Sequence, residues 1–309
     1  MNTKTKGYIL GALGAASYGT NPMFAIPLYR DGMDPTSVLF FRYLIAVPVI
    51  ALMMRFRGRG FALHGGGEVV STLSMGVLMA LSSLALFVSY RYMGAGIAST
   101  LLFLYPIMVA VIMSVFFKER AGIVTALSIV LALAGVFLIS FKPGGEMVSF
   151  VGTVFVFASA LSYAVYLVCV NQLKALKAMP TLKLTFYIVA VGTVMFGAMG
   201  LMGGGIRLPH QPHLWLNVVC LGILPTALSF YFTTQATTMI GSTPTAILGA
   251  LEPLTAVVTG VLLLGEPMTL RIAAGFVLVI LGVTMIVARG NISLIIIRIR
   301  KMFPKVKRR

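Results

Sequence analysis

The sequence predicts an all-α membrane protein, with ten transmembrane helices in two inverted five-helix repeats around a central cavity. Three observations predict this fold class: the composition, a series of ten apolar segments and an internal repeat. Hydrophobic residues make up 59% of the 309 residues and charged residues only 10%, and the mean hydropathy is +1.01. Soluble domains are about one quarter charged, so this composition is typical of membrane proteins.

Ten segments are apolar and long enough to cross a bilayer roughly 30 Å thick, which takes about 20 helical residues. They lie at 7–28, 35–54, 71–92, 95–117, 121–141, 148–170, 182–203, 213–239, 242–264 and 269–288. Short charged or Gly/Pro-rich joints separate them. The first segment is too long for a signal peptide and has no obvious small-residue cleavage site, so we expect it to be a retained span.

The positions of lysine and arginine predict the orientation. If the N-terminus is inside, most of the 24 Lys and Arg residues fall on inner joints and the tail. The outer joints hold only Arg30, Arg91, Lys142, Arg207 and Arg271. This asymmetry predicts a multi-pass protein of a bacterial cell membrane with both termini in the cytoplasm. It also accounts for most of the net charge of +17, so nucleic acid is not expected as a partner.

The end of the chain, ISLIIIRIRKMFPKVKRR, is first apolar and then basic. We interpret residues 290–309 as a basic cytoplasmic tail that binds anionic lipid headgroups, each basic residue contributing about 1 kcal/mol. A disordered, solvated tail is the alternative. The sequence does not distinguish a monomer from a homodimer.

The two halves of the sequence repeat each other. GAASYGTN (14–21) matches SALSYAVY (159–166) at a separation of 145 residues. At 147 residues, GAGIASTLLFLYPIMVAV matches GSTPTAILGALEPLTAVV, and the register pairs Pro106 with Pro253 and Gly135 with Gly282. Because each half has five spans, the second half must cross the membrane in the opposite sense. Inverted repeats are typical of secondary transporters, whose substrate sites lie between the repeats.

The stretches YPIMVAVIMSVFFKER and EPLTAVVTGVLLLGEPMTL resemble the paired hallmark of the drug/metabolite transporter superfamily, EamA family. The resemblance covers nearly the whole chain, as two EamA-like repeats at 7–140 and 149–287. It implies that the first, third, fourth, sixth, eighth and ninth spans surround the cavity, and that the protein is an exporter. Lys118 stands where the family usually has glycine. The motif does not specify the substrate, because the family carries amino acids, metabolites and drugs on one scaffold.

Polar stripes on the first and sixth spans are candidate walls of the cavity. Gly14, Ser17, Tyr18 and Asn21 share one helical face. The matching residues of the sixth span are Ser159, Ser162, Tyr163 and Tyr166. The eighth span is also polar and includes Ser229, so it should face protein or water. Alternatively, the small residues permit close helix packing and the tyrosines fill gaps.

Glu252 lies among apolar residues in ILGALEPLTAVVTG, residues 247–260. As the eleventh residue of its span it is predicted about 16 Å into the bilayer, near the midplane. A charge there costs roughly 2.5–3.5 kcal/mol, which favours a role in substrate binding or proton coupling. Pro253 is expected to leave the Gly249 carbonyl without its helical partner, as in the broken helices of transporters. The alternative is a protonated glutamic acid that only supports the kink.

Other candidates surround this acid. Tyr105 is the first-half counterpart of Glu252, so we expect an asymmetric site with one ionisable group among aromatic rings. Arg42, in FFRYLIAV, lies in the outer third of the second span and is able to bind an anionic group, although we favour structural pairing or snorkelling. Glu119 and Glu266 precede the fifth and tenth spans, where stabilisation of a helix start explains both.

These features together predict a secondary-active transporter that moves a small organic solute, such as an amino acid, an amine or another metabolite, by alternating access. Proton coupling through Glu252 is a hypothesis. The alternatives are a membrane channel or a non-transport integral membrane protein. The histidines lie in loops, and no HExxH motif, intramembrane aspartate pair or nucleotide-binding loop occurs, so we expect no enzyme activity, cofactor or metal. Cys169 and Cys220 are interpreted as small buried side chains.

Overall fold

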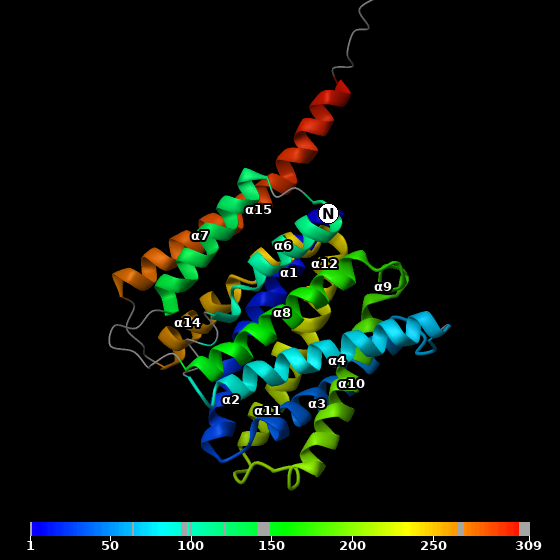
Figure 1. Cartoon of the computed structure of the whole chain (residues 1–309), viewed down its shortest axis with the longest axis vertical. Coiled ribbons are helices and arrows are strands. Elements are labelled where there is room, and N and C mark those ends of the chain that lie inside the picture. Colours follow the sequence, from blue (N-terminus) through cyan, green and yellow to red (C-terminus); the bar gives the residue numbers. More distant parts are fainter. Residues whose placement is uncertain are drawn as a thin grey trace, which may run out of the picture.

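The computed structural model of the protein describes residues 2–63, 65–93, 98, 101–119, 122–140, 149–264 and 269–302. Within these residues every regular element is a helix (Figure 1). The first half contains α1 (Thr3–Gly19), α2 (Asn21–Arg30), α3 (Pro35–Phe56), α4 (Gly66–Ser89), α6 (Tyr105–Phe117) and α7 (Ile123–Ser140). The second half contains α8 (Phe150–Gln172), α9 (Lys174–Ala178), α10 (Thr181–Met202), α11 (Leu214–Gly222), the π-helix η1 (Ile223–Leu228), α12 (Ser229–Ile240), α13 (Ser242–Leu248), α14 (Leu251–Leu264) and α15 (Leu270–Met302).

Six helical segments of the described chain are long and apolar enough to cross a membrane. They are Pro35–Phe56, Gly66–Ser89, Phe150–Gln172, Thr181–Met202, Leu214–Ile240 and Leu270–Ala288. All six coincide with predicted spans. The other four predicted spans, 7–28, 95–117, 121–141 and 242–264, fall on shorter or interrupted helices, and part of 95–117 lies outside the described residues.

The predicted span 7–28 is not one continuous helix, because α1 ends at Gly19 and α2 begins at Asn21. Pro22 has no backbone N–H and therefore cannot continue the hydrogen bonding of α1, although it fits the first turn of a new helix. The hydroxyl of Thr20 donates to the Ser17 carbonyl at 2.7 Å and satisfies one of the carbonyls freed at the end of α1.

A second irregularity is the π-helix η1, which lies between α11 and α12 in the predicted span 213–239. In a regular helix the Leu221 carbonyl would accept a hydrogen bond from residue 225, which is a proline here. The hydroxyl of Thr226 donates to this carbonyl instead, at 2.7 Å. The missing proline donor therefore accounts for the local change of helical pitch.

The predicted spans 95–117 and 242–264 are both interrupted just before their prolines. A turn at Phe103–Leu104 precedes α6, and a turn at Gly249–Ala250 separates α13 from α14. Under the 147-residue register these turns differ by only one position. At its other end α6 stops at Lys118, whose φ of 55° is left-handed. Glycine adopts this conformation without strain, which is a physical reason for the glycine expected at this position from the resemblance to the EamA family.

Helices α7 and α15 lie side by side at one edge of the bundle and touch through glycines (Figure 1). A Cβ atom on Gly135 would lie 2.6 Å from the Gly275 carbonyl oxygen, and one on Gly282 would lie 2.8 Å from the Ser128 carbonyl oxygen. Such close backbone approaches need glycine. A shift of 147 residues converts Ser128 into Gly275 and Gly135 into Gly282, so the two contacts exchange under the repeat. Their order along the chain makes α7 and α15 antiparallel.

A second pair of contacts exchanges in the same way. Ser82 of α4 donates a hydrogen bond to the Ser159 carbonyl of α8 at 3.0 Å. Ser229, at the start of α12, donates to the Gly14 carbonyl of α1 at 2.9 Å. In each case the third span of one half is hydrogen-bonded to the first span of the other half. The hydrogen bonds that join the two halves therefore involve Ser229 and the first residue of each polar stripe, Gly14 and Ser159.

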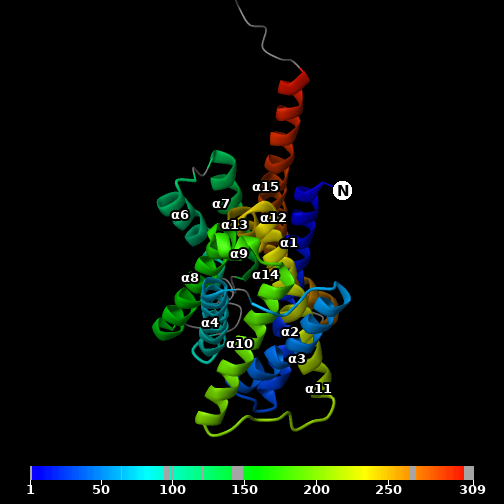
Figure 2. The same cartoon turned by 90° about the vertical axis from the view of Figure 1, so that its right-hand side faces the viewer.

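The C-terminal helix is longer than the sequence predicts. The span was expected to end at residue 288, but α15 continues without a break to Met302. Figure 2 shows this part of α15 extending beyond the rest of the bundle. Residues 303–309 of the predicted tail, and Glu266 with Pro267, lie outside the described residues.

Asp34 caps the start of α3 and gives the fold a predictable sensitivity to acid. Its carboxylate accepts hydrogen bonds from Thr36 N at 3.1 Å, Ser37 N at 3.2 Å and Ser37 Oγ at 2.6 Å. Partial burial opposes the charged form, but these bonds outweigh burial, so the pKa of Asp34 lies below 3.8. A carboxylate with a lowered folded-state pKa stabilises the fold above its unfolded pKa and loses this effect as the pH falls through the folded value.

We therefore expect the melting temperature of the purified protein to fall as the pH drops below 3.8. In Asp34→Asn, which keeps a capping oxygen, this part of the acid sensitivity should disappear. Asp34→Ala should cost about 0.5–2 kcal/mol at neutral pH, because a helix cap is lost. The same loss of melting temperature in acid for Asp34→Asn and the wild type would contradict this role.

Candidate functional site

Arg42 of α3 is fully buried and joins the two irregular helices. Its Nε donates to Thr226 Oγ1 at 2.6 Å and its Nη2 to the Pro225 carbonyl at 3.0 Å, both in η1. Its Nη1 makes a longer contact, 3.5 Å, to Asn21 Oδ1 at the start of α2. Irregular backbone inside a membrane protein must find partners within the protein, and Arg42 supplies them. The favoured structural pairing is present, whereas snorkelling is wrong because the side chain reaches no surface.

The guanidinium of Arg42 also lies among aromatic rings. Its central carbon is 5.4 Å from the ring centre of Tyr18, 5.5 Å from that of Phe87 and 5.7 Å from that of Phe230. Such contacts favour a cation in a desolvated site. Among the described residues no carboxylate lies within ion-pair distance of this guanidinium. Within the described residues, its hydrogen bonds and ring contacts are all with neutral groups.

A group of tyrosines from both halves lies near Tyr18, one of the rings around this arginine. The ring centres of Tyr105 and Tyr163 are 4.9 Å apart and those of Tyr163 and Tyr166 are 6.2 Å apart. The Tyr166 hydroxyl is hydrogen-bonded to Thr234 Oγ1 at 2.6 Å. The structure therefore brings Tyr105 of the fourth span together with the polar stripe of the sixth span, as the repeat suggests.

Glu252 stands in the first turn of α14, next to these tyrosines. It is half-buried and interacts electrostatically with Tyr18, Tyr105 and Tyr163. The Gly249 carbonyl lacks its regular helical partner, as expected, because residue 253 is a proline. It is not free, however, since Glu252 N donates to it at 2.9 Å. The turn that interrupts the helix supplies this donor itself.

Glycines allow three helices to meet at the break before Glu252. A Cβ atom on Gly249 would overlap the Tyr105 hydroxyl, and a Cβ on Gly19 would overlap the Glu252 carbonyl oxygen. The end of α1, the break between α13 and α14, and the start of α6 are therefore in direct contact. Ser17 and Ser162 of the two stripes are partly buried, and the structure shows no specific contact of their hydroxyls that would mark a site.

A pocket of about 240 Å³ opens between α2 and α4. Its lining residues are Asn21, Pro22, Ala25, Ile26, Tyr29, Phe87 and Tyr90. The hydroxyl oxygen of Tyr29 is buried there without a hydrogen-bond partner. The sequence interpretation missed Tyr29, although Asn21, Ala25 and Tyr29 follow at intervals of four and continue the stripe of the first span. Phe87 and Tyr90 carry no comparable signal, since they look like ordinary apolar residues of the third span.

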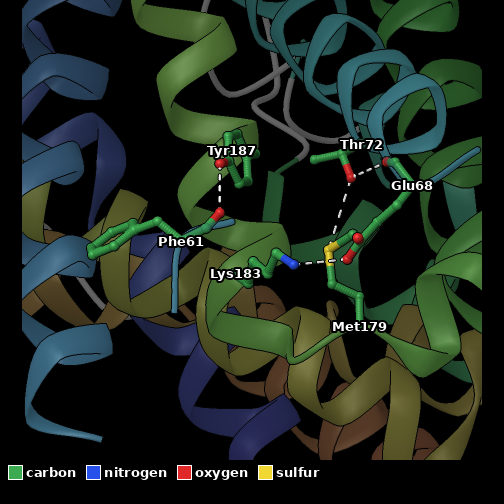
Figure 3. A network of polar contacts seen from close by, with 6 residues as sticks. All are labelled: Phe61, Glu68, Thr72, Met179, Lys183 and Tyr187. Carbon is green, nitrogen blue, oxygen red and sulfur yellow. Dashed lines mark hydrogen bonds and ion pairs between the residues drawn. The ribbon is translucent and has the colours of Figure 1, made fainter. Parts of the chain in front are cut away.

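A second polar cluster lies at the other end of α4 (Figure 3). Lys183 of α10 forms an ion pair with Glu68 of α4 at 2.9 Å, and both side chains are mostly buried. The Thr72 hydroxyl contacts the Met179 sulfur at 3.8 Å, and the Tyr187 hydroxyl donates to the Phe61 carbonyl at 2.7 Å. A surface pocket of about 680 Å³ adjoins the ion pair. This cluster ties the first half to the second near the basic joints.

Removing one partner of this ion pair should be costly. In Lys183→Met the Glu68 carboxylate loses the Lys183 ammonium group in a mostly buried position, and we expect a loss of about 3–5 kcal/mol in the free energy of unfolding. The double variant Glu68→Gln/Lys183→Met should recover part of this loss, because the buried negative charge is then removed together with Lys183. The measurement is chemical unfolding in detergent for the single and double variants. A double variant as unstable as the sum of both single changes would contradict the pairing.

Comparison with known proteins gives consistent matches along most of the chain. A sequence profile of the EamA-like transporter family matches residues 5–141 and again residues 150–288. An uncharacterized transporter of Archaeoglobus fulgidus is 28% identical over 273 residues, which cover 88% of this chain and 92% of the relative. The uncharacterized transporter YdfC of Bacillus subtilis is 26% identical over 278 residues, covering 84% and 85%. One solved crystal structure superposes on the protein with a TM-score of 0.78 and covers 91% of this chain and 96% of the other chain. The sequence identity is 16%, so this similarity concerns the fold alone.

Proposed function

Because the chain belongs to the EamA-like transporter family and is a multi-pass membrane transporter, not an enzyme, we propose that it is a secondary-active carrier. It moves a small organic solute, such as an amino acid, an amine or another metabolite, by alternating access. The solute site lies between the two halves, where Arg42, the tyrosines and Glu252 are close together. Proton coupling through Glu252 belongs to this proposal.

The observation that carries the proposal is the exchange of contacts between the halves. Gly135 approaches α15 as Gly282 approaches α7, and these equivalent helices run antiparallel. This supports an inverted repeat of five spans in each half, at 7–140 and 149–287. Two such halves can rock about a fixed central site, which is how secondary transporters expose a site to each side in turn.

The interruptions in the fourth and ninth spans support the position of the site. Transporters commonly place substrate and ion sites where helices are discontinuous, since backbone groups and helix ends become available there. Here Tyr105 of one interrupted span packs on Gly249 of the other, and Glu252 follows directly. An acid in this place can take up and release a proton as the halves move.

The arrangement in the membrane follows from the basic residues. The protein lies in the cell membrane of a bacterium with both termini in the cytoplasm, and the basic tail binds anionic lipid. The Glu68–Lys183 cluster then faces the cytoplasm, and the pocket between α2 and α4 belongs to the outer half. Export follows from the family resemblance. The carrier acts as a monomer or a homodimer.

Counterflow in vesicles tests the proposal. Purified protein reconstituted in lipid vesicles is loaded with unlabelled candidate solutes, and uptake of the labelled solute is followed from outside. A carrier gives saturable uptake that the internal solute accelerates. Saturation without this acceleration, or flux that rises linearly with concentration, would favour a channel and contradict alternating access.

A further inference from the structure

We propose that the pocket between α2 and α4 binds a solute with a carboxylate group, whose charge is matched by Arg42. This inference rests on the proposed transport function. It adds a binding pocket within the first half, on the α2–α4 side of Arg42, and the chemical class of the solute. Its basis is a buried cation that forms no ion pair among the described residues, placed behind a pocket whose wall includes a buried hydroxyl without a hydrogen-bond partner.

Arg42 is a buried cation that forms no ion pair among the described residues. A buried guanidinium is normally paired with an acid, because neutral acceptors satisfy its N–H groups without cancelling its charge. Here hydrogen bonds go to the Thr226 hydroxyl, the Pro225 carbonyl and the Asn21 amide, and the guanidinium also interacts with the Tyr18 hydroxyl. Three aromatic rings lie close to it. Arginine has five N–H donors, so these bonds leave capacity for a ligand. Within the described residues no carboxylate forms an ion pair with Arg42; Glu252 interacts with the neighbouring Tyr18 but is not within ion-pair distance of the guanidinium.

Arg42 lies directly behind the wall of the pocket. Asn21 and Phe87 both line the pocket, and both also contact the guanidinium. Only one layer of side chains therefore separates Arg42 from the pocket. The Asn21 contact, at 3.5 Å, is the longest of the three hydrogen bonds and the easiest to exchange for a ligand oxygen. A carboxylate suits this place because the planar guanidinium can bind both of its oxygens.

Tyr29 also belongs to the wall of the pocket. Its hydroxyl is buried at the pocket and makes no hydrogen bond, which is unusual for a buried polar group. A small movement of the Tyr29 ring toward the pocket would let a ligand oxygen become its partner. The hydroxyl and the side chain of Asn21 mark the polar end of the pocket, whereas Pro22, Ala25 and Ile26 form an apolar wall.

The volume limits the solute. A pocket of about 240 Å³ holds roughly eight water molecules at about 30 Å³ each. This is smaller than the usual range of drug-sized sites, about 300–1,000 Å³. The pocket therefore fits a small monocarboxylate with a short apolar or aromatic body, and excludes large drugs.

Matched acids and amides test the inference on the full chain in lipid nanodiscs. The probes are benzoate with benzamide and butyrate with butyramide, and binding is measured by titration calorimetry. We expect the wild type to bind at least one acid about tenfold more tightly than its amide, as for a charge-assisted hydrogen bond. Tyr29→Phe should weaken acid binding severalfold without changing the melting temperature of the free protein, because the lost hydroxyl has no protein partner. Arg42→Gln should remove the preference for the acid.

Arg42 also supports η1, so Arg42→Gln can fail to fold, and Arg42→Lys serves as the second variant. It keeps the charge and should retain part of the acid preference. Equal binding of acids and amides, binding of neither, or an unchanged acid preference in Tyr29→Phe would overturn the inference. Counterflow separates this failure from that of the proposed function: exchange of neutral solutes without preference for acids would leave the carrier intact and remove only carboxylate recognition.

Discussion

Replacing Glu252 by glutamine is expected to abolish the effect of a pH gradient on transport. Glutamine keeps the size and hydrogen-bonding capacity of the side chain but cannot take up or release a proton. Glu252 lies in the first turn of α14 beside Tyr18, Tyr105 and Tyr163, where both halves meet. If it carries the coupled proton, Glu252→Gln vesicles should show the same solute flux with and without a gradient, whereas wild-type flux should respond to it.

Two controls make this result specific. Glu119→Gln alters an exposed glutamate just after α6 and should leave coupled flux unchanged. Counterflow without a gradient should persist in Glu252→Gln, since exchange of solute needs no net proton movement. Wild-type coupling in the Glu252→Gln vesicles would show that the proton binds elsewhere. Loss of counterflow together with coupling would assign Glu252 to solute binding.

Adding one methyl group at Gly249 is expected to have the largest effect on the packing of the site. A Cβ atom there would overlap the Tyr105 hydroxyl, so Gly249→Ala must displace either Tyr105 or the turn between α13 and α14. Overpacking in a well-packed interior typically costs about 1–3 kcal/mol. We expect a lower melting temperature and a loss of solute binding, because the displaced turn carries Glu252.

The double variant Gly249→Ala/Tyr105→Phe tests the contact directly. Removal of the hydroxyl oxygen takes away the nearest atom, so part of the lost stability should return. Gly67→Ala is a matched control, since nothing lies within 4 Å of a Cβ atom at this position. Additive losses in the double variant, with no recovery, would show that the overlap is relieved in another way.

The sequence predicts the long helices of this protein well and its irregular places poorly. Apolar length alone locates spans such as 35–54 and 182–203, because a membrane helix needs little more than a run of apolar residues. Pro22 and Pro225 mark where hydrogen bonds are missing, but not how they are replaced. In the π-helix, Thr226 replaces the missing donor to the Leu221 carbonyl, and Arg42, from a distant part of the chain, is hydrogen-bonded to Thr226.

The candidate site was predictable to the extent that the repeat determines it. The register paired Glu252 with Tyr105, and Tyr105 does lie near Glu252 and Tyr163. The register also aligned the two polar stripes, but Gly14 and Ser159 of these stripes each contact the third span of the opposite half. The partners of Arg42 and the pocket at Tyr29 could not be foreseen, since they arise where α2, α3, α4 and η1 meet. A pattern within one helix gives the face of a residue but not the neighbour opposite it.

The prolines behind the two irregular helices have no equivalents in the other half. The repeat places Leu167 opposite Pro22 and Leu78 opposite Pro225, and both leucines lie in unbroken helices. At each of these positions, one half therefore has an irregular helix where the other half has a continuous one. In a carrier that alternates between two orientations, such unequal halves give the orientations different energies. An empty carrier of this kind has a resting side, and its solute must shift that balance before a cycle can begin.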